Sequence, residues 1–224
     1  MTPLVLKLGG SLAESKRLRR LLALVGHARR PVVIVPGGGA FADAVRETQA
    51  ALGFSDVVAH DMAILAMQQM ADAMIDLEPR FKAAETLIGM TRAWRRNRIP
   101  VWMPAALCTG DRRIPRDWSI TSDGLAARLA ERLGDVELVL VKSCAVRPKA
   151  SAKQLARQGI VDPVFADIVE RANITWRVIG AGGDAQLAAA LDVAKRDGKR
   201  TPARRRIEKS ATPNRLIGAR RAAR

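Results

Sequence analysis

A unit of one apolar strand and one glycine turn occurs twice near the start of the chain, and it constrains the fold more than any other feature. Residues 4–8 are mostly apolar and end at two glycines, which turn the backbone without a Cβ. Residues 31–35 form a second apolar run, followed by Pro-Gly-Gly-Gly at 36–39 and a helical pattern over 40–52. Strands, bare turns and helices in this order predict parallel strands joined by crossover helices.

Apolar runs and helical patterns alternate along the rest of the chain as well. We expect strands at residues 99–103, 136–141 and 176–179, and helices at 62–77, 81–94, 123–133 and 164–172. Ser11 and Glu14 are predicted to form a capping box, and Ser122 is predicted to cap the helix that begins there. The predicted class is therefore α/β with a mainly parallel open sheet.

Positive charge is concentrated at the C-terminal end. The whole chain carries a net charge of +16, and residues 195–224 hold twelve Lys and Arg against Asp197 and Glu208. We therefore expect one domain over residues 1–194 and a basic tail over 195–224. The tail has few large apolar residues, so it cannot bury enough surface to order itself and is expected to be disordered. An electrostatic contact with nucleic acid or an acidic partner is the alternative.

The sequence argues against several classes of protein. No apolar stretch approaches the ~20 residues of a membrane span. Two separated cysteines, Cys108 and Cys144, and two histidines build neither a disulfide framework nor a metal cluster. A Walker P-loop, a G-x-G-x-x-G fingerprint and a G-x-S-x-G nucleophile turn are all absent. We expect a cytoplasmic protein without a metal-ligand cluster or a membrane partner.

The first glycine turn is a candidate site for an anion. Free backbone N–H groups and a helix N-terminus attract negative charge, and Lys7 adds a full positive charge beside them. The second turn would face the same crevice, because ligands in open α/β sheets bind at the carboxyl ends of the strands. An ordinary βα turn with a solvated Lys7 is the alternative. His60 could donate a hydrogen bond to an acceptor phosphate or have a structural role.

Three segments in this order resemble the amino acid kinase superfamily: Lys-Leu-Gly-Gly-Ser at 7–11, Pro-Gly-Gly-Gly at 36–39 and Ser-Asp-Gly-Leu-Ala-Ala-Arg-Leu-Ala at 122–130. Within that superfamily, His-Asp-Met-Ala-Ile-Leu-Ala-Met at 60–67 resembles the aminomethylfuran-phosphate kinases of methanofuran biosynthesis. The resemblance implies a three-layer αβα sandwich that transfers a phosphoryl group from ATP with Mg²⁺. It also implies a homodimer or a higher homo-oligomer.

The resemblance further implies roles for individual residues. Lys7 would bridge the phosphates, and Asp123 would orient the catalytic lysines without acting as a base. Binding of the acceptor and its phosphate would fall to Gly9, Gly10, Ser11, Gly37, Gly38, Gly39 and His60, and binding of the nucleotide to Lys142 and Ser143. Positioning and charge neutralisation dominate phosphoryl transfer, so no strong base is required. Taken by itself, Asp123 would be explained by the helix dipole.

The chain departs from the family pattern in two places. The family's Gly-Gly-Met-x-x-Lys stretch, which carries a second lysine, is absent. Lys142, Lys149 or Lys153 could take its place, and the sequence does not choose among them. The closing Gly-Thr strand after the last helix is replaced by the basic tail.

The predicted function is that of an ATP-dependent small-molecule kinase with an anionic acceptor, and an aminomethylfuran phosphate is the most specific candidate. Kinases of an acyl phosphate or of a nucleoside or isoprenoid phosphate are alternatives within the same class. A kinase-like protein that has lost catalysis and binds a ligand or partner is the alternative outside it. The missing second lysine favours that alternative, whereas Lys7 and Asp123 argue against it.

Overall fold

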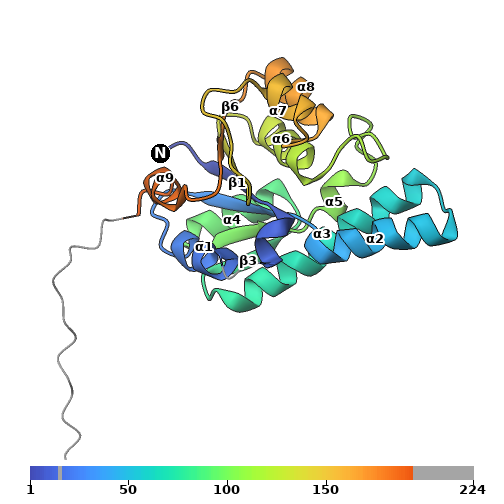
Figure 1. Ribbon diagram of the computed structural model, residues 1–224. Helices are drawn as coiled ribbons and strands as arrows, with labels where there is room; N and C mark the ends of the chain where they lie inside the picture. Colours follow the sequence, from blue (N-terminus) through green and yellow to red (C-terminus); the bar gives the residue numbers. More distant parts are fainter. Residues whose placement is uncertain (15–16, 194–224) are drawn as a thin grey trace, which may run out of the picture. The chain divides into compact units, whose positions relative to one another are not determined.

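A six-stranded sheet of parallel strands runs through the protein in the order β3-β4-β2-β1-β5-β6 (Figure 1). The strands are β1 (Leu4–Leu8), β2 (Val32–Pro36), β3 (Phe81–Ala84), β4 (Ile99–Trp102), β5 (Glu137–Val141) and β6 (Thr175–Ile179). The computed structural model describes residues 1–14 and 17–193, and the predicted basic tail lies outside them. The predicted α/β class with a parallel open sheet is confirmed.

Helices connect the strands and cover both faces of the sheet (Figure 1). They are the 3-10 helix η1 (Gly10–Glu14) and the α-helices α1 (Arg17–Val25), α2 (Gly39–Leu52), α3 (Asp56–Leu77), α4 (Leu87–Arg95), α5 (Ala105–Cys108), α6 (Ser122–Leu133), α7 (Ala152–Arg157), α8 (Pro163–Arg171) and α9 (Asp184–Ala190). None of the helices in the described part of the chain has both the length and the apolar character needed to cross a membrane.

Strand β1 lies inside the sheet, between β2 and β5. The chain passes from β1 to β2 and outward on one side, and it later returns to place β5 on the other side of β1. Such a reversal leaves a crevice at the carboxyl ends of the two strands, where open α/β sheets bind ligands. Gly9 follows β1 at this point and donates its N–H to the carbonyl of Val141 in β5 at 3.0 Å. The first glycine turn therefore lies where this topology places a binding site.

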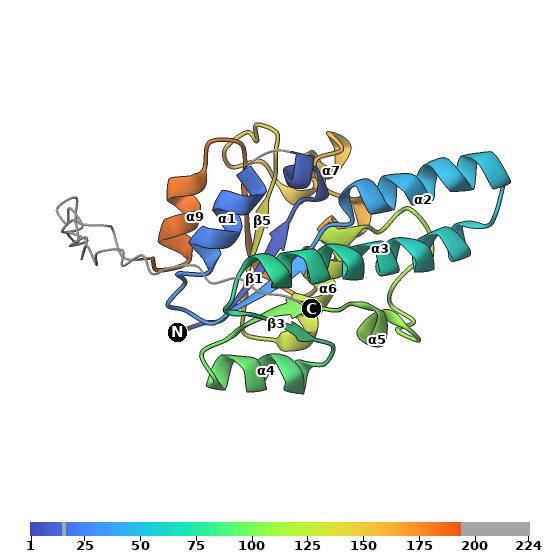
Figure 2. The same ribbon diagram turned by 90° about the horizontal axis from the view of Figure 1, so that it is seen from below.

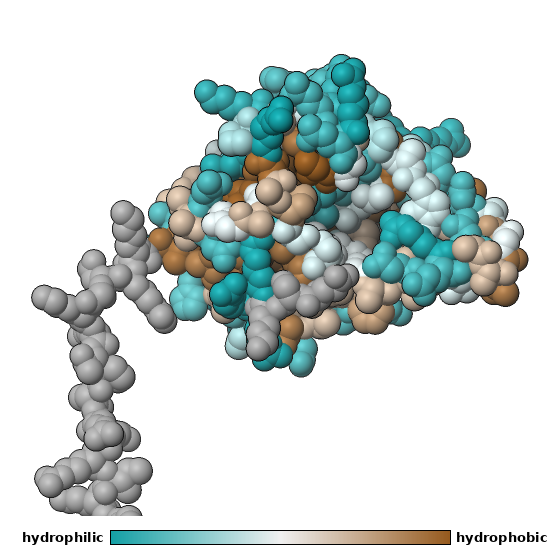
Figure 3. Space-filling model, viewed as in Figure 1, coloured by the Kyte–Doolittle hydropathy of each residue, from teal (hydrophilic) through white to brown (hydrophobic). Residues whose placement is uncertain are grey.

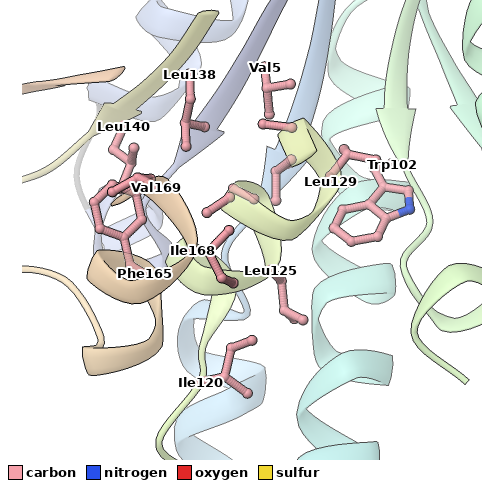
Figure 4. Close-up of a cluster of buried hydrophobic side chains, with 14 of the residues drawn as sticks. Val5, Trp102, Ile120, Leu125, Leu129, Leu138, Leu140, Phe165, Ile168 and Val169 are labelled. Carbon is pink, nitrogen blue, oxygen red and sulfur yellow. The ribbon is translucent and has the colours of Figure 1, made fainter. Parts of the chain in front are cut away.

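Alternate residues of β1 point to opposite faces of the sheet. The three leucines of β1 pack with α1 and α9 on one face, whereas Val5 packs with α6 and α8 on the other. Figure 4 shows the second core, where Leu125 of α6 and Phe165 of α8 lie beneath the strands. Lys7 is two residues from Val5, so its side chain is on the α6 face. These two covered faces confirm the three-layer αβα sandwich.

Helices α2 and α3 lie side by side and extend beyond the sheet (Figures 1 and 2). Large apolar side chains remain exposed along this pair: Phe41 (44%), Leu52 (76%), Val57 (41%), Val58 (46%) and Leu65 (53%). Apolar colour gathers at the far end of the pair in Figure 3. The body of the protein therefore leaves part of the apolar surface of both helices uncovered.

The helix predicted over residues 81–94 is wrong at its start. Phe81–Ala84 forms the edge strand β3, and α4 begins only after Thr86, whose hydroxyl accepts the N–H of Gly89 at 3.0 Å. The strand is short and contains a Lys and two Ala, which are uncommon in strands, so the sequence carried little signal for it. Pairing with β4 supplies the stabilisation that local propensity lacks.

The predicted capping box at Ser11 is also wrong. Residues 10–14 form a 3-10 helix, and the hydroxyl of Ser11 lies 2.8 Å from that of Ser143. A capping box does occur at Ser151 and Gln154, where it starts α7 in a stretch that the sequence analysis left without a helix. The capping-box pattern is only four residues long, so a match in the sequence does not by itself show that a capping box forms.

Candidate active site

The two glycine turns predicted from the sequence lie against each other. A Cβ added to Gly10 would stand 2.4 Å from the backbone N of Gly39, and one added to Gly37 would stand 2.4 Å from the backbone N of Gly10. A side chain at either position would therefore displace the opposite turn. Gly39 also has a φ of +54°, which L-residues rarely adopt. Close backbone approach explains why the sequence has glycine at these positions.

Two lysines share one buried carboxylate beside these turns. Nζ of Lys7 lies 2.8 Å from Oδ1 of Asp123, and Nζ of Lys142 donates to Oδ2 at 2.5 Å. Lys7 and Asp123 are only 4% and 3% exposed. The three residues come from β1, the first turn of α6 and the position directly after β5. Strand pairing sets Lys7 opposite Leu140, so Lys142 lies just beyond the end of the strand pair.

The charges of this cluster influence one another strongly. Burial by itself would raise the pKa of Asp123, but Lys7 and Lys142 outweigh it and hold the pKa below its ordinary value. Burial and the charge of Lys7 lower the pKa of Lys142, although Asp123 opposes this shift. A carboxylate that stays ionised between two ammonium groups is suited to orient them and is a poor proton acceptor.

The three lysines proposed as replacements for the missing family motif lie in different places. Lys142 contacts Asp123, as described above. Lys153 forms an exposed ion pair with Glu170 at 2.7 Å, and Lys149 lines a separate cavity. The geometry therefore selects Lys142, a choice that the sequence left open.

A first cavity, of about 230 Å³, opens beside the glycine turns. Glycines of both turns line it together with Ser11 and His60. Ile64 and Met67 of α3 give it an apolar side, and Asp43 is the acidic residue among the described lining residues. The cavity thus combines bare backbone, apolar surface and a few polar groups, as small-molecule sites commonly do.

Trp118 forms a wall of this cavity that the sequence analysis missed. Its indole N–H donates to Oε1 of Gln49 at 2.7 Å, and the guanidinium of Arg46 lies 4.3 Å from the ring centroid. Arg46 also pairs with Asp43 at 2.8 Å. The indole is therefore held from two sides and presents an aromatic surface to the cavity. The sequence signal that could have pointed to this residue was a single Trp in an otherwise charged loop.

A second cavity, of about 550 Å³, lies between the loop after β5 and the turn after β6. Residues 145–150 and 180–183 line it. Ser143, at the start of the first of these loops, reaches Ser11 of η1 through their hydroxyl groups. Lys142, just before Ser143, contacts Asp123, whose neighbour Ser122 lines the first cavity.

A model of the amino acid kinase family matches residues 2–145, well over half of the chain. The chain belongs to the amino acid kinase family. A (5-(aminomethyl)furan-3-yl)methyl phosphate kinase of Methanocaldococcus jannaschii is 32% identical over 141 residues. The match covers 61% of this chain and 63% of that protein, so the chain spans less than two thirds of this relative.

Two solved kinase structures resemble this one at low sequence identity. Uridylate kinase from Archaeoglobus fulgidus superposes with a TM-score of 0.61 at 19% identity, covering 86% of this chain and 96% of that chain. UMP kinase from Ureaplasma parvum gives 0.57 at 14% identity, covering 79% and 88%. These two structures support the shared fold.

His60 lies within α3 in this member of the amino acid kinase family, one turn beyond the helix start, because α3 begins at Asp56 and not at residue 62 as predicted. It is 4% exposed and lines the first cavity. Burial lowers its pKa, although a hydrogen bond with the backbone of Asp117 opposes the shift. His60 is therefore mainly neutral at pH 7.

Asp162 is the second residue of this amino acid kinase family site that the sequence analysis missed. It is 7% exposed, and its Oδ2 accepts the backbone N–H groups of Thr121 and Gly124, both at 2.8 Å. The predicted cap of α6, Ser122, is in fact in the first turn of that helix, after Thr121. No local sequence signal marks a cap that comes from 38 residues away.

Proposed function

We propose that this protein is an ATP-dependent kinase that phosphorylates a small anionic acceptor. The observation that carries the proposal is the buried Lys7–Asp123–Lys142 cluster beside two touching glycine turns. Phosphoryl transfer depends on positioning and on neutralising charge that spreads over the phosphoryl oxygens. Two oriented ammonium groups would supply that neutralisation, together with backbone N–H groups of the turns other than those of Gly9 and Gly37, which bond to Val141 and Leu8.

The two cavities suggest which substrate binds where. We assign the acceptor, with its phosphate, to the first cavity, because Gly10, Gly38 and Gly39 line it. We assign ATP to the second and larger cavity, whose lining begins at Ala145, two residues after Ser143. An oxygen of the acceptor phosphate would attack the γ-phosphorus, the bond to ADP would break, and a new P–O–P bond would form.

The residues present fit ATP better than they fit a directly bound metal ion. Within residues 1–14 and 17–193, no group of three or more His, Cys, Asp and Glu side chains is placed to hold a metal. Asp123 is occupied by both lysines. Mg²⁺ bound together with the nucleotide would add positive charge beside the transferred phosphoryl group.

An aminomethylfuran phosphate is the proposed acceptor. The Methanocaldococcus jannaschii relative supports this choice by its named substrate. Such a molecule has a phosphate, a flat ring and an ammonium group. The first cavity offers glycine backbone, Trp118 and Asp43, which complement these three parts in turn. Other phosphate acceptors, including an acyl, nucleoside or isoprenoid phosphate, remain the alternatives.

Loss of catalysis is the competing proposal, and Lys142 argues against it. The missing family motif removed the second lysine from its usual place in the sequence. Lys142 restores an ammonium group on Asp123 from a different segment. A site that had lost its chemistry would not need a buried Lys7 and a partly buried Lys142 on one carboxylate, because their desolvation is costly.

We also propose a homodimer in the cytoplasm, where ATP is available. The exposed apolar side chains of α2 and α3, among them Leu52 and Leu65, support self-association, because a second copy could cover them. Sedimentation equilibrium of the wild type and of Leu65→Glu would test this. A monomeric wild-type protein would contradict the dimer.

Release of ADP with ATP, Mg²⁺ and a panel of acceptors tests the kinase directly. The panel contains aminomethylfuran phosphate, UMP, isopentenyl phosphate, acetylglutamate and aspartate. We expect turnover with aminomethylfuran phosphate that falls by about 100-fold or more in Lys7→Ala while the protein stays folded. Unchanged turnover in Lys7→Ala, or no ATP binding by the wild type, would reject the proposal.

A further inference from the structure

A carboxylate outside the lysine cluster joins the starts of two helices. Oδ2 of Asp162 accepts the N–H of Thr121, the hydroxyl of Thr121 and the N–H of Gly124, at 2.8, 2.9 and 2.8 Å. Oδ1 accepts the N–H of Phe165 at 2.8 Å and so caps α8. One buried side chain therefore satisfies N–H groups at the beginnings of both α6 and α8.

These contacts bracket Asp123 on both sides. Thr121 and Gly124 flank it in sequence, so Asp162 restrains the backbone from which the Asp123 carboxylate projects toward the two lysines. The contact leaves no room for a side chain at position 124, because a Cβ on Gly124 would stand 2.7 Å from Oδ1 of Asp162. Thr121, the cap residue of α6, makes no side-chain cap of its own.

Asp162 also contributes charge to the cluster. Lys142 contacts Asp123, the charges of Lys7 and Asp162 also act on it, and its carbonyl accepts a hydrogen bond from Arg17 at 2.9 Å. Burial and Lys7 lower the pKa of Lys142, and Asp162 acts with Asp123 to oppose that shift. Burial and the nearby Asp123 carboxylate raise the pKa of Asp162, while its hydrogen bonds from Gly124 and Thr121 oppose that shift.

We propose that Asp162 is a positioning residue for phosphoryl transfer, which holds the start of α6 so that Asp123 aims at both lysines. The inference rests on the proposed kinase activity. An ordinary helix cap would affect stability alone, whereas this role also affects turnover and the titration of Lys142.

The test compares Asp162→Ser and Asp162→Asn with a matched cap variant. A serine at position 162 can still cap α8, but it removes the negative charge and is too short to accept the N–H groups at the start of α6. Thr86→Ala removes a cap bond of α4 away from both cavities. Each protein is checked for folding by thermal melting, and kcat, KM for ATP and the pH profile of kcat are then measured well below the melting temperature.

We expect both Asp162 variants to lose at least about tenfold in kcat with a smaller change in KM. The alkaline limb of their kcat profile should move to lower pH, because Lys142 loses its ammonium form more easily. Thr86→Ala should lose stability and keep its kcat. The inference is overturned if the folded Asp162 variants behave like Thr86→Ala, or if neither variant folds, since Asp162 would then be purely structural.

A measurement that needs no turnover separates this inference from the proposed kinase. In protein with 13C-labelled lysine, the NMR titration of Lys142, assigned with Lys142→Arg, should move to lower pH in Asp162→Ser. An inactive wild type with this shift would reject the kinase and keep the link between Asp162 and Lys142. An unmoved titration would reject the link whatever the activity.

Discussion

Lys142 donates to the same carboxylate of Asp123 that Lys7 contacts from the opposite oxygen, although the two lysines are 135 positions apart. Lys7 belongs to β1, and Lys142 follows β5, which is paired with β1 in register. The parallel pairing therefore brings both ammonium groups to one end of the sheet. Asp123 at the start of α6 completes the cluster from the helical layer that packs on the Val5 face of the sheet.

Lys142→Ala is expected to reduce turnover by about 100-fold or more, because it removes positive charge from the phosphoryl group in the transition state. Lys153→Ala is the matched control, since its ammonium forms an exposed ion pair with Glu170. It should retain the wild-type rate. The rate of ADP release is measured for both variants. A larger loss of turnover in Lys153→Ala than in Lys142→Ala would contradict the assignment of Lys142.

Gly10→Ala is expected to separate the two glycine turns, because the new Cβ would overlap the backbone of Gly39. Overpacking of this kind costs about 1–3 kcal/mol. Gly9→Ala should be milder, since its Cβ would stand 3.1 Å from the carbonyl of Val141. Urea unfolding of both variants measures the difference. Equal stability of Gly10→Ala and the wild type would show that the contact is not tight.

Asp43→Asn is expected to weaken binding of an acceptor that carries an ammonium group, and to raise its KM by about fivefold, a scale set by exposed ion pairs. An analogue with a hydroxymethyl group in place of the aminomethyl group should show no such change. Glu47→Gln on the same helix alters an exposed carboxylate away from the lining of the first cavity and serves as control. If Asp43→Asn changes the KM of both acceptors equally, the Asp43 carboxylate does not bind the ammonium group.

His60 is expected to make the protein less stable in mild acid. Burial lowers its pKa from 6.5, so the unfolded state binds a proton more readily than the folded state. The free energy of unfolding should therefore fall as the pH drops through the unfolded value, from about pH 7.5 to pH 5.5. His60→Asn should reduce this loss. His27→Asn, which alters an exposed histidine, is the matched control.

Residues that act through local backbone chemistry were predictable from the sequence. The glycine turns follow apolar strands directly, so their place at the carboxyl end of the sheet followed from the strand pattern. The sequence placed Lys7 and Asp123 at the ends of predicted elements, and resemblance to a family suggested their shared role. The structure brings the two side chains into contact, and their chemical roles stay predictions.

Residues that act through long-range contacts were not predictable in the same way. Choosing Lys142 over Lys149 and Lys153 required the register of β5 against β1. Asp162 caps α6 from 38 positions away, so the search for a local cap selected Ser122 instead. Trp118 gained its place from contacts with a distant helix. In each case tertiary packing, and not local propensity, decided the outcome.

Because side chains alternate in β1, the site is sensitive to insertion or deletion of a residue in this strand. Val5 and Lys7 share one face of the sheet, and the leucines share the other. Removing or adding one residue before Lys7 would invert this parity, bury an ammonium group among the leucines' partners on α1 and α9, and leave Asp123 facing a leucine. A single-residue insertion or deletion in this strand is therefore expected to disrupt the site and both cores at once.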